Sequence, residues 1–250
     1  MRLLENKVAV ITGGARANSI GRATATLFRD HGATLAILDL DGEGAADLAS
    51  NLGADHVGIA CDVADAEAVN GAIGQVHDRF QRIDIACPIA GVSWPGKIAE
   101  ITDQDYDRML DVNLRGTFHL CRAVVPAMKQ AGGGAIVCMA SVAAQRGGGI
   151  IGGAHYAAAK GGVLGLMRAM ARELGPDRIR VNAVCPSYIE TNIGGDGFTD
   201  ADKAKIAAVS VLGRNGRPEE VASTFLFLAS DLASFITGAT IDVNGGVHIR

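Results

Sequence analysis

The stretch that decides the fold runs from residue 8 to residue 21 and reads VAVITGGARANSIG. Its first five residues form a continuous apolar run, which is typical of a strand buried on both faces of a parallel sheet. A glycine-rich turn follows and leads into a segment of helical period at 20–31. Such a turn presents backbone N–H groups and the positive end of a helix dipole to a phosphate. We therefore predict a phosphate site at Gly13, Ser19, Ile20 and Gly21.

The rest of the chain repeats this pattern of a short apolar run followed by a helical stretch. Further strands are predicted at 34–38, 57–61, 83–87, 135–139, 181–184 and 240–243, and helices at 20–31, 42–52, 65–80, 103–130, 156–175 and 218–230. Apolar strands separated by helices indicate a parallel sheet covered on both faces. The alternation continues without a Pro- or Ser-rich linker, so we predict one domain, 1–250, with a Rossmann-type doubly wound α/β fold.

The composition of the 250 residues excludes several classes of protein. The chain has 23 basic and 27 acidic residues, and only 4% of its residues are aromatic. A nucleic-acid partner and a polybasic membrane surface are therefore not expected. No apolar run approaches the roughly 18 residues of a spanning helix, and the start of the chain does not resemble a signal peptide. The five cysteines are scattered singly, so we expect no metal and no disulfide framework, and a cytoplasmic protein.

Two carboxylates follow predicted strands. Asp39 closes the second strand, 18 residues after Gly21. A carboxylate at this point can accept both hydroxyls of an adenosine ribose and repels a 2′-phosphate, which favours NAD over NADP. Asp62 follows the third strand, where it either meets the adenine edge or caps the next helix.

Two segments interrupt the rhythm of strands and helices. Residues 145–155 form a glycine-rich loop after the fifth strand, and residues 192–217 follow the sixth strand, with three glycines at 194–197. Ligands in doubly wound folds bind beyond the carboxyl ends of the strands, where both segments fall. We predict that 192–217 is a substrate lid, with a surface excursion as the alternative.

A tyrosine and a lysine open one predicted helix four residues apart. This spacing places the phenol of Tyr156 and the ammonium of Lys160 on one helical face. A cation there favours the phenolate and lowers the tyrosine pKa from about 10 toward that of a useful acid/base. Ser141 ends the fifth strand and can offer its hydroxyl to the same reacting oxygen. Taken alone, the tyrosine–lysine pair is a common pattern.

In order and approximate spacing, these motifs resemble those of the short-chain dehydrogenase/reductase family. The resemblance runs from about residue 7 to residue 247. It rests on Thr12-Gly13 with Ile20-Gly21, Asp39, Asp62-Val63, Ala90-Gly91, Asn113, Ser141, Tyr156 with Lys160, Pro186, Thr191 and the tail 238–246. It implies seven strands in the order 3-2-1-4-5-6-7, hydride transfer between a nicotinamide and a carbonyl or alcohol carbon, and a homotetramer.

The resemblance also implies roles for single residues. Tyr156 would be the acid/base, Lys160 would lower its pKa and hold the nicotinamide ribose, and Ser141 would polarise the substrate oxygen. Asn113 would order a proton-relay water. The remaining cofactor contacts implied are Val63, Ile89, Ala90, Gly91, Pro186, Ile189 and Thr191.

Three departures from the family pattern concern geometry. The phosphate turn is two residues longer than usual, and Ser19 takes the place of its middle glycine. The segment Cys87-Pro88-Ile89-Ala90-Gly91 replaces Asn-Asn-Ala-Gly, so the hydrogen bonds of that motif must come from other groups. Ser187 replaces a glycine after Pro186. No catalytic group is lost.

Three residues are candidates for substrate contact. Arg146 lies in the glycine-rich loop, five residues after Ser141, and its guanidinium fork suits a carboxylate; the alternative is a solvated or interface arginine. His155 either touches substrate or caps its helix. Trp94 either walls the pocket or packs in the interior.

We therefore predict an NAD-dependent oxidoreductase acting on a small polar or anionic secondary alcohol or ketone, of the sugar acid, hydroxy acid or polyol type. The first alternative is a 3-oxoacyl-carrier ketoreductase that uses NADPH. The second, of another class, is a non-catalytic nucleotide-sensing regulator. Turnover with a panel of alcohols separates the regulator from both enzymes.

Overall fold

A seven-stranded parallel sheet forms the centre of the molecule in the computed structural model, which describes residues 2–148, 151–191, 193 and 198–249. The strands lie in the order β3-β2-β1-β4-β5-β6-β7, as predicted. Their bounds are β1 Val8–Thr12, β2 Thr34–Asp39, β3 Val57–Ala60, β4 Ile85–Pro88, β5 Gly134–Met139, β6 Ile179–Pro186 and β7 Thr240–Val243. The order reverses direction beside β1, between β1 and β4, which is the switch point where ligands bind in such sheets.

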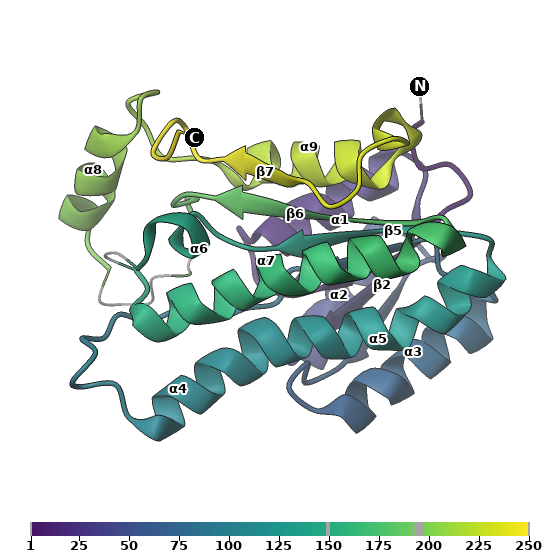
Figure 1. Cartoon of the computed structure of the whole chain (residues 1–250). Helices are drawn as coiled ribbons and strands as arrows, with labels where there is room; N and C mark the ends of the chain where they lie inside the picture. Colours follow the sequence, from purple (N-terminus) through teal and green to yellow (C-terminus); the bar gives the residue numbers. More distant parts are fainter. Residues whose placement is uncertain (1, 149–150, 192, 194–197, 250) are drawn as a thin grey trace.

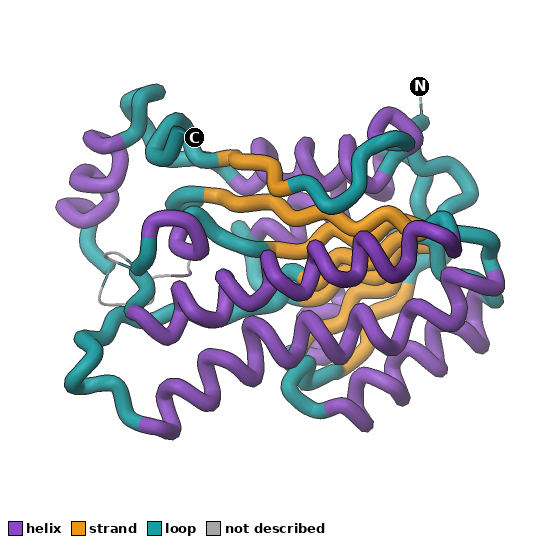
Figure 2. Tube along the Cα trace, in the orientation of Figure 1, coloured by secondary structure: helices purple, strands orange, loops and turns teal. Residues whose placement is uncertain are grey.

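Helices cover both faces of the sheet (Figure 1). One layer contains α3 (Ala66–Phe80), α4 (Asp103–Leu110), α5 (Gly116–Gln130) and α7 (Ala154–Leu174). The other contains α1 (Ile20–Asp30), α2 (Gly42–Leu52) and α9 (Pro218–Ala229). Shorter helices are α6 (Ala143–Arg146), α8 (Asp200–Val209) and the 3₁₀ turns η2 (Gly175–Asp177) and η4 (Asp231–Ala233). Figure 2 shows the same three layers, with the strands between the helices.

The core consists of two apolar clusters, one on each face of the sheet. Alternate residues of β1 enter different clusters: Val8 and Val10 pack toward α3, α5 and α7, whereas Ala9 and Ile11 pack toward α1, α2 and α9. This division follows from the period of two in a strand. Because both faces are covered, most strand residues are apolar; Arg180 and Asn182 of β6 and Asp242 of β7 are exceptions.

Two predicted elements differ in detail. The helix predicted at 103–130 is interrupted by a π-helical turn, η1 (Asp111–Arg115), which separates α4 from α5. The strand predicted at 83–87 begins at Ile85 and ends at Pro88, because proline can end a strand but cannot donate to the ladder beyond it. Asn192 and the glycines at 194–197, part of the predicted lid, and residues 149–150 of the predicted loop lie outside the described residues.

The carboxyl ends of β5, β6 and β7 point toward the side of the molecule where α6 and α8 lie (Figure 1). Several segments that are distant in sequence therefore meet at this edge of the sheet. In the described part of the chain, no helix combines the length and the apolar character needed to cross a bilayer.

Candidate active site

Two adjoining cavities open at the carboxyl edge of the sheet. The larger, of about 690 Å³, extends from the turn after β1 past Asp39 and Asp62 to α4. The smaller, of about 350 Å³, lies in front of Ser141, Tyr156 and Lys160. Both are lined by Ile20, Ile89, Gly91, Thr191 and Ile193. A ligand that spans both cavities can therefore place one end beside Asp39 and the other beside Tyr156.

Glycines bring the backbone close to the larger cavity. Gly13 has φ +82°, and a Cβ built on it would lie 2.8 Å from the Cα of Ala90. A Cβ on Gly21 would collide with the carbonyl of Gly13. The turn after β1 can therefore pack against the start of α1 only if residue 21 is glycine. Because of these close backbone contacts, the turn after β1 and the loop after β4 lie side by side at the edge of the larger cavity.

The additional residues of the phosphate turn are held by side chains. Arg22 of α1 donates to the carbonyls of Ala15 at 2.6 Å and Arg16 at 3.2 Å. Asn18, at φ 53°, donates through Nδ2 to the carbonyl of Glu190 at 2.8 Å. The turn is thus tied at one end to its own helix and at the other to the segment after β6.

Ser19 acts as the N-cap of α1. Its Oγ accepts a hydrogen bond from the N–H of Arg22 at 3.1 Å, which satisfies one of the free donors at the start of the helix. Ser19 also lines the larger cavity, so its hydroxyl proton remains able to reach a ligand there.

Asp39 and Asp62 both line the larger cavity. The carboxylate of Asp39 accepts from the N–H of Ala15 at 2.9 Å and from that of Asp41 at 3.1 Å, which fixes its orientation at the end of β2. Asp62 accepts from the N–H of Ala64 at 2.9 Å. It does not cap α3: Asp65 is the N-cap, so that alternative is wrong.

Thr12 supplies the hydrogen bonds that the unusual segment after β4 needs. Its Oγ1 accepts from the N–H groups of Ile89 at 3.0 Å and Ala90 at 3.1 Å, just beyond Pro88. The hydroxyl is buried, with Thr12 only 1% exposed. One threonine of β1 therefore fixes the backbone that continues to Gly91 between the two cavities.

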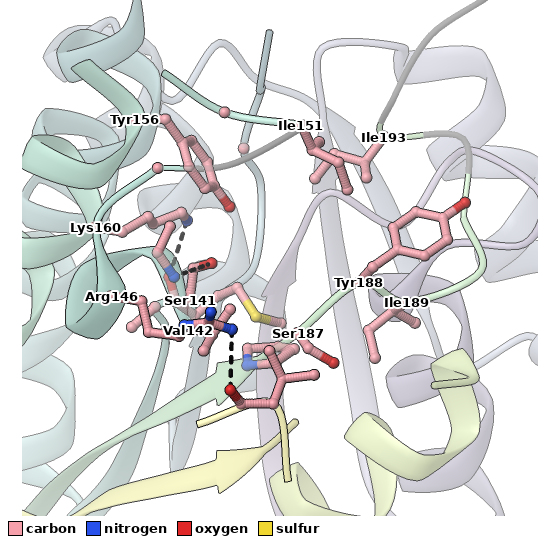
Figure 3. Close-up of a pocket in the computed structure, with 18 of the residues that line it drawn as sticks. Ser141, Val142, Arg146, Ile151, Tyr156, Lys160, Ser187, Tyr188, Ile189 and Ile193 are labelled. Atoms are coloured by element: carbon pink, nitrogen blue, oxygen red, sulfur yellow. Dashed lines mark hydrogen bonds between the residues drawn. The ribbon is translucent and has the colours of Figure 1, made fainter. Parts of the chain in front are cut away.

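Ser141, Tyr156 and Lys160 all line the smaller cavity, and Figure 3 shows them on the same wall. Ser141 follows β5, and its Oγ accepts from the N–H of Ala143 at 3.1 Å at the start of α6. Lys160 is buried, and its Nζ donates to the carbonyl of Met139 at 2.9 Å. The same Nζ lies 5.8 Å from the centre of the Tyr156 ring.

Burial governs the two pKa values of this pair. It raises the pKa of Tyr156 above 10, an effect that the Ser141 side chain partly offsets. Burial also lowers the pKa of Lys160 to about 8. The predicted lowering of the Tyr156 pKa is therefore not present in the chain without a bound cofactor, because desolvation of the phenolate is the largest influence on it.

Asn113 lies in the π-helical turn η1 and lines the smaller cavity. Its Nδ2 donates to the carbonyls of Val92 at 2.9 Å and Met109 at 3.0 Å. Its Oδ1 is buried and accepts no hydrogen bond from the described residues. A Cβ on Gly91 would lie 2.6 Å from this oxygen, so a side chain there would cover it. Because residue 91 is glycine, no side chain covers the unsatisfied Oδ1 of Asn113.

The segment after β6 closes the smaller cavity on the side opposite Tyr156. Pro186, Ile189 and Thr191 line it, as predicted, and Thr191 also lines the larger cavity. Figure 3 shows Tyr188, Ile189 and Ile193 on this second wall. Tyr188, with its ring 4.9 Å from that of Phe198, was not singled out in the sequence, and neither were Ile151, Ile193, Ile206 and Val209. Tyr188 follows β6 directly, and the only sequence signal of the other four is that they fall in the two segments that interrupt the strand–helix pattern.

The three predicted substrate residues have different positions. Arg146 lines the smaller cavity, although it ends helix α6 rather than lying in a loop. Its Nη1 donates to the carbonyl of Val247 at 2.9 Å. Trp94 lines neither cavity and packs edge-on against His155 with ring centres 5.6 Å apart, so packing is its role.

His155 also lies outside the lining of both cavities, and it is buried in the first turn of α7. Gly153 is the N-cap of that helix. The predicted capping role of His155 is therefore wrong, and its contact with substrate stays a prediction. Its ring is buried, and neither ring nitrogen has a hydrogen-bond partner among the described residues.

The two cavities fit a nicotinamide dinucleotide. The larger offers glycine-lined backbone at a helix N-terminus and a carboxylate at the end of β2, as phosphates and a ribose require. The smaller offers the open acceptor of Asn113 and the buried ammonium of Lys160. Among the described residues, no group of three or more His, Cys, Asp and Glu side chains is placed to hold a metal ion.

Comparison with known proteins gives consistent matches over the whole chain. A family model described as enoyl-(acyl carrier protein) reductase matches residues 13–248. An uncharacterised short-chain type dehydrogenase/reductase of Sinorhizobium fredii is 49% identical over 99% of this chain and 100% of its own length. D-threitol dehydrogenase of Mycolicibacterium smegmatis is 41% identical, covering 99% and 95%. A 3-oxoacyl-[acyl-carrier-protein] reductase of Thermotoga maritima is 38% identical, covering 98% and 99%.

Solved structures are equally similar. A crystal structure of a short-chain dehydrogenase/reductase, glucose/ribitol dehydrogenase, from Brucella melitensis superposes with a TM-score of 0.91. It is 38% identical in sequence, and the match covers 99% of both chains. The fold of this chain and the order of its helices and strands are therefore those of solved short-chain dehydrogenase/reductase structures.

Proposed function

Because this chain belongs to the short-chain dehydrogenase/reductase family, we propose that it transfers a hydride between NAD(H) and the carbinol or carbonyl carbon of a secondary alcohol or ketone. The observation that carries the proposal is the convergence of Asn113, Ser141, Tyr156 and Lys160 on one cavity that adjoins the glycine-lined one. When bound, the oxidised nicotinamide accepts the hydride from the alcohol carbon.

The chain's own residues handle the proton and the substrate oxygen. The phenolate of Tyr156 accepts the proton of the substrate hydroxyl during oxidation, and the phenol returns it during reduction. Ser141 donates a hydrogen bond to the same oxygen. The ammonium of Lys160 stabilises the phenolate and binds the nicotinamide ribose. The open Oδ1 of Asn113 accepts from a water that leads the proton to solvent. An intact set of these groups disfavours a non-catalytic nucleotide sensor.

The cofactor is proposed to lie along both cavities. Gly13, Ser19, Ile20 and Gly21 hold the pyrophosphate, and Asp39 accepts the adenosine ribose hydroxyls. Asp62 and Val63 border the adenine. Ile89, Ala90 and Gly91 carry the chain past the nicotinamide ribose, and Pro186, Ile189 and Thr191 hold the carboxamide side.

The choice of cofactor tests this placement. Asp39 should repel a 2′-phosphate at short range, so we expect NAD to exceed NADP by at least about tenfold in kcat/KM. The variant Asp39→Ala should lose most of that preference while it retains turnover. Comparable kcat/KM with both cofactors in the unmodified enzyme would refute the role of Asp39.

One alternative activity has support of its own. The Thermotoga maritima relative is a 3-oxoacyl-[acyl-carrier-protein] reductase, and the matching family model carries an acyl-carrier description. NADPH would have to be accommodated beside Asp39, where Arg16 is the nearby cation that lines the same cavity. A clear NADPH preference in the test above would favour this ketoreductase.

The substrate, assembly and location are proposed as follows. The D-threitol dehydrogenase relative supports a small polar alcohol, whereas the predominantly aliphatic lining of the smaller cavity favours a substrate with an apolar part. The segment 192–217, from which Ile206 and Val209 line the cavity, is the proposed lid. Phe118, which is 39% exposed on α5, supports a homotetramer, to be checked by light scattering. Five buried cysteine thiols suit the reducing cytoplasm.

A further inference from the structure

Aliphatic side chains make up most of the smaller cavity. Apart from the catalytic set and the backbone of glycines, its walls consist largely of Val142, Ile151, Tyr188, Ile189, Ile193, Ile206, Val209 and Val247. Figure 3 shows several of these residues on the wall that faces Tyr156. A cavity of this kind gains free energy when it takes up apolar surface rather than a chain of hydroxyl groups.

The apolar path continues to the molecular surface. Val209, at the end of α8, is 59% exposed and Ile193 is 37% exposed, and both line the cavity. An aliphatic chain can therefore leave the cavity along these side chains without meeting a charged group of the described lining. The path has room for several carbons within a cavity of about 350 Å³.

The charges that face this cavity are of one sign. Within the described lining, the charged side chains are Arg146 and Lys160, and no carboxylate is present. Lys160 is buried and donates to the carbonyl of Met139, next to the proton-transfer site. Arg146 is the cation that remains for a substrate group. Arg146 is exposed at the rim of the cavity, so an anion reaches it directly from solvent.

The contacts of Arg146 leave its binding edge open. Its Nη1 donates to the carbonyl of Val247, 101 residues away in the chain, which fixes the side chain at the cavity (Figure 3). The neighbouring Gln145 donates to Asp242 at 2.7 Å and fixes α6 from the same side. Nε and Nη2 make no hydrogen bond to the described residues. These two donors form the edge of the guanidinium that binds a carboxylate in a bidentate manner.

We infer that the substrate of this enzyme is an amphiphilic carboxylate. Its secondary alcohol or ketone lies at Tyr156, its aliphatic part lies along Ile193, Ile206 and Val209, and its carboxylate binds the Nε–Nη2 edge of Arg146. The inference rests on the proposed hydride transfer for the position of the reacting carbon. It replaces the small polar substrate with a specific chemical class.

A merely structural role of Arg146 makes a different prediction. If the side chain only fastened the Val247 carbonyl, its loss would disturb charged and neutral ligands equally. Arg146→Gln tests this directly, because glutamine keeps a polar side chain but has no charge and no guanidinium edge. Arg146→Lys keeps the charge and removes the edge. Arg79→Gln is the matched control: Arg79 is also exposed, donates to a loop carbonyl, that of Ala54, and lines neither cavity.

The test is the binding of octanoate and octanamide to the NADH complex, measured by isothermal titration calorimetry. We expect the unmodified enzyme and Arg79→Gln to prefer octanoate by about 10- to 100-fold, as a charge-assisted bidentate contact implies. Arg146→Gln should abolish the preference, and Arg146→Lys should retain part of it. From butyrate to octanoate, affinity should rise about fourfold per methylene, which corresponds to about 0.8 kcal/mol for each buried CH₂.

The outcomes separate this inference from the proposed function. Three results would overturn the inference of an amphiphilic carboxylate substrate, even if the same preparation oxidises polyols with NAD. They are equal binding of octanoate and octanamide, no binding of either, and a preference for octanoate that survives in Arg146→Gln. Binding of octanoate as described, without hydride transfer to any alcohol or hydroxy acid, would instead overturn the dehydrogenase activity. Hydroxy acids and their methyl esters complete the test: KM should rise in Arg146→Gln for the acids and stay within about twofold for the esters.

Discussion

Replacing Thr12 by valine removes one hydroxyl and should weaken the whole enzyme. Valine has nearly the shape of threonine and an equal or better preference for a strand, so β1 itself should be retained. The lost atom is the Oγ1 that accepts from the N–H groups of Ile89 and Ala90, in a position that is 1% exposed. Water cannot easily replace it. The N–H of Ile89 is then left buried, and that of Ala90 partly buried, without an acceptor.

The size of the effect follows from these two donors. Each buried N–H that loses its partner costs about 1–3 kcal/mol, so Thr12→Val should lower the free energy of unfolding by about 2–6 kcal/mol. Thr24 provides the matched control, because it is 0% exposed and its Oγ1 has no hydrogen-bond partner among the described residues. Thr24→Val removes an unsatisfied hydroxyl, so it should be neutral or slightly stabilising.

Urea unfolding measures both variants at one protein concentration. Thr12→Val should shift the midpoint strongly at an unchanged slope m, and it should also weaken NADH binding, because Ala90 packs against Gly13 at the cofactor cavity. Thr24→Val should leave NADH binding unchanged. If the two valine variants had equal stability, the claim that Thr12 replaces the missing amide side chains after β4 would be wrong.

Two further predictions concern protonation. Desolvation raises the pKa of Tyr156 above 10 in the cofactor-free enzyme, so ultraviolet titration of its phenolate, read as the difference from Tyr156→Phe, should show no ionisation of this residue below pH 10. Ionisation of Tyr156 near neutral pH in the cofactor-free enzyme would contradict this assignment. Burial lowers the pKa of Lys160 to about 8 from 10.5, so between these values the unfolded chain binds more protons and the cofactor-free enzyme should become more stable as pH rises. In urea unfolding, Lys160→Met should remove this rise of the free energy of unfolding with pH, and the variant should also bind NADH more weakly. If the variant kept the same pH dependence of stability, a group other than Lys160 would be its cause.

The positions of the strands could be predicted because they depend on a strong local signal. Buried parallel strands are largely apolar, and a helical stretch follows most of them, so the positions of β1, β2, β5 and β7 follow from the pattern. The order of the sheet was predicted from the family resemblance, since the apolar pattern does not fix which strands are neighbours. The π-helical turn at Asp111–Arg115 could not be predicted in this way. It shifts the helical phase by a single residue, which apolar periodicity over 103–130 does not reveal.

The site could be predicted in part, and the wrong predictions about it have a common physical origin. Most of the proposed catalytic and cofactor residues follow strands or open helices, so the topology places them at one edge. The capping role of His155 was wrongly predicted, because sequence spacing does not fix which residue caps a helix or where a side chain points in its first turn. The pKa of Tyr156 was expected to fall because the pattern contains Lys160 but not the depth of burial. The contact of Arg146 with Val247 joins segments too distant for any local pattern.

The central claim is that Tyr156 transfers the proton while the chain binds NAD(H). The most direct measurement is kcat for alcohol oxidation by Tyr156→Phe, taken together with NADH affinity from fluorescence titration. Phenylalanine retains the ring and removes the hydroxyl, so the account predicts a fall in kcat of about 10²–10⁴ or more with NADH affinity nearly unchanged. Near-normal turnover by Tyr156→Phe would contradict the account.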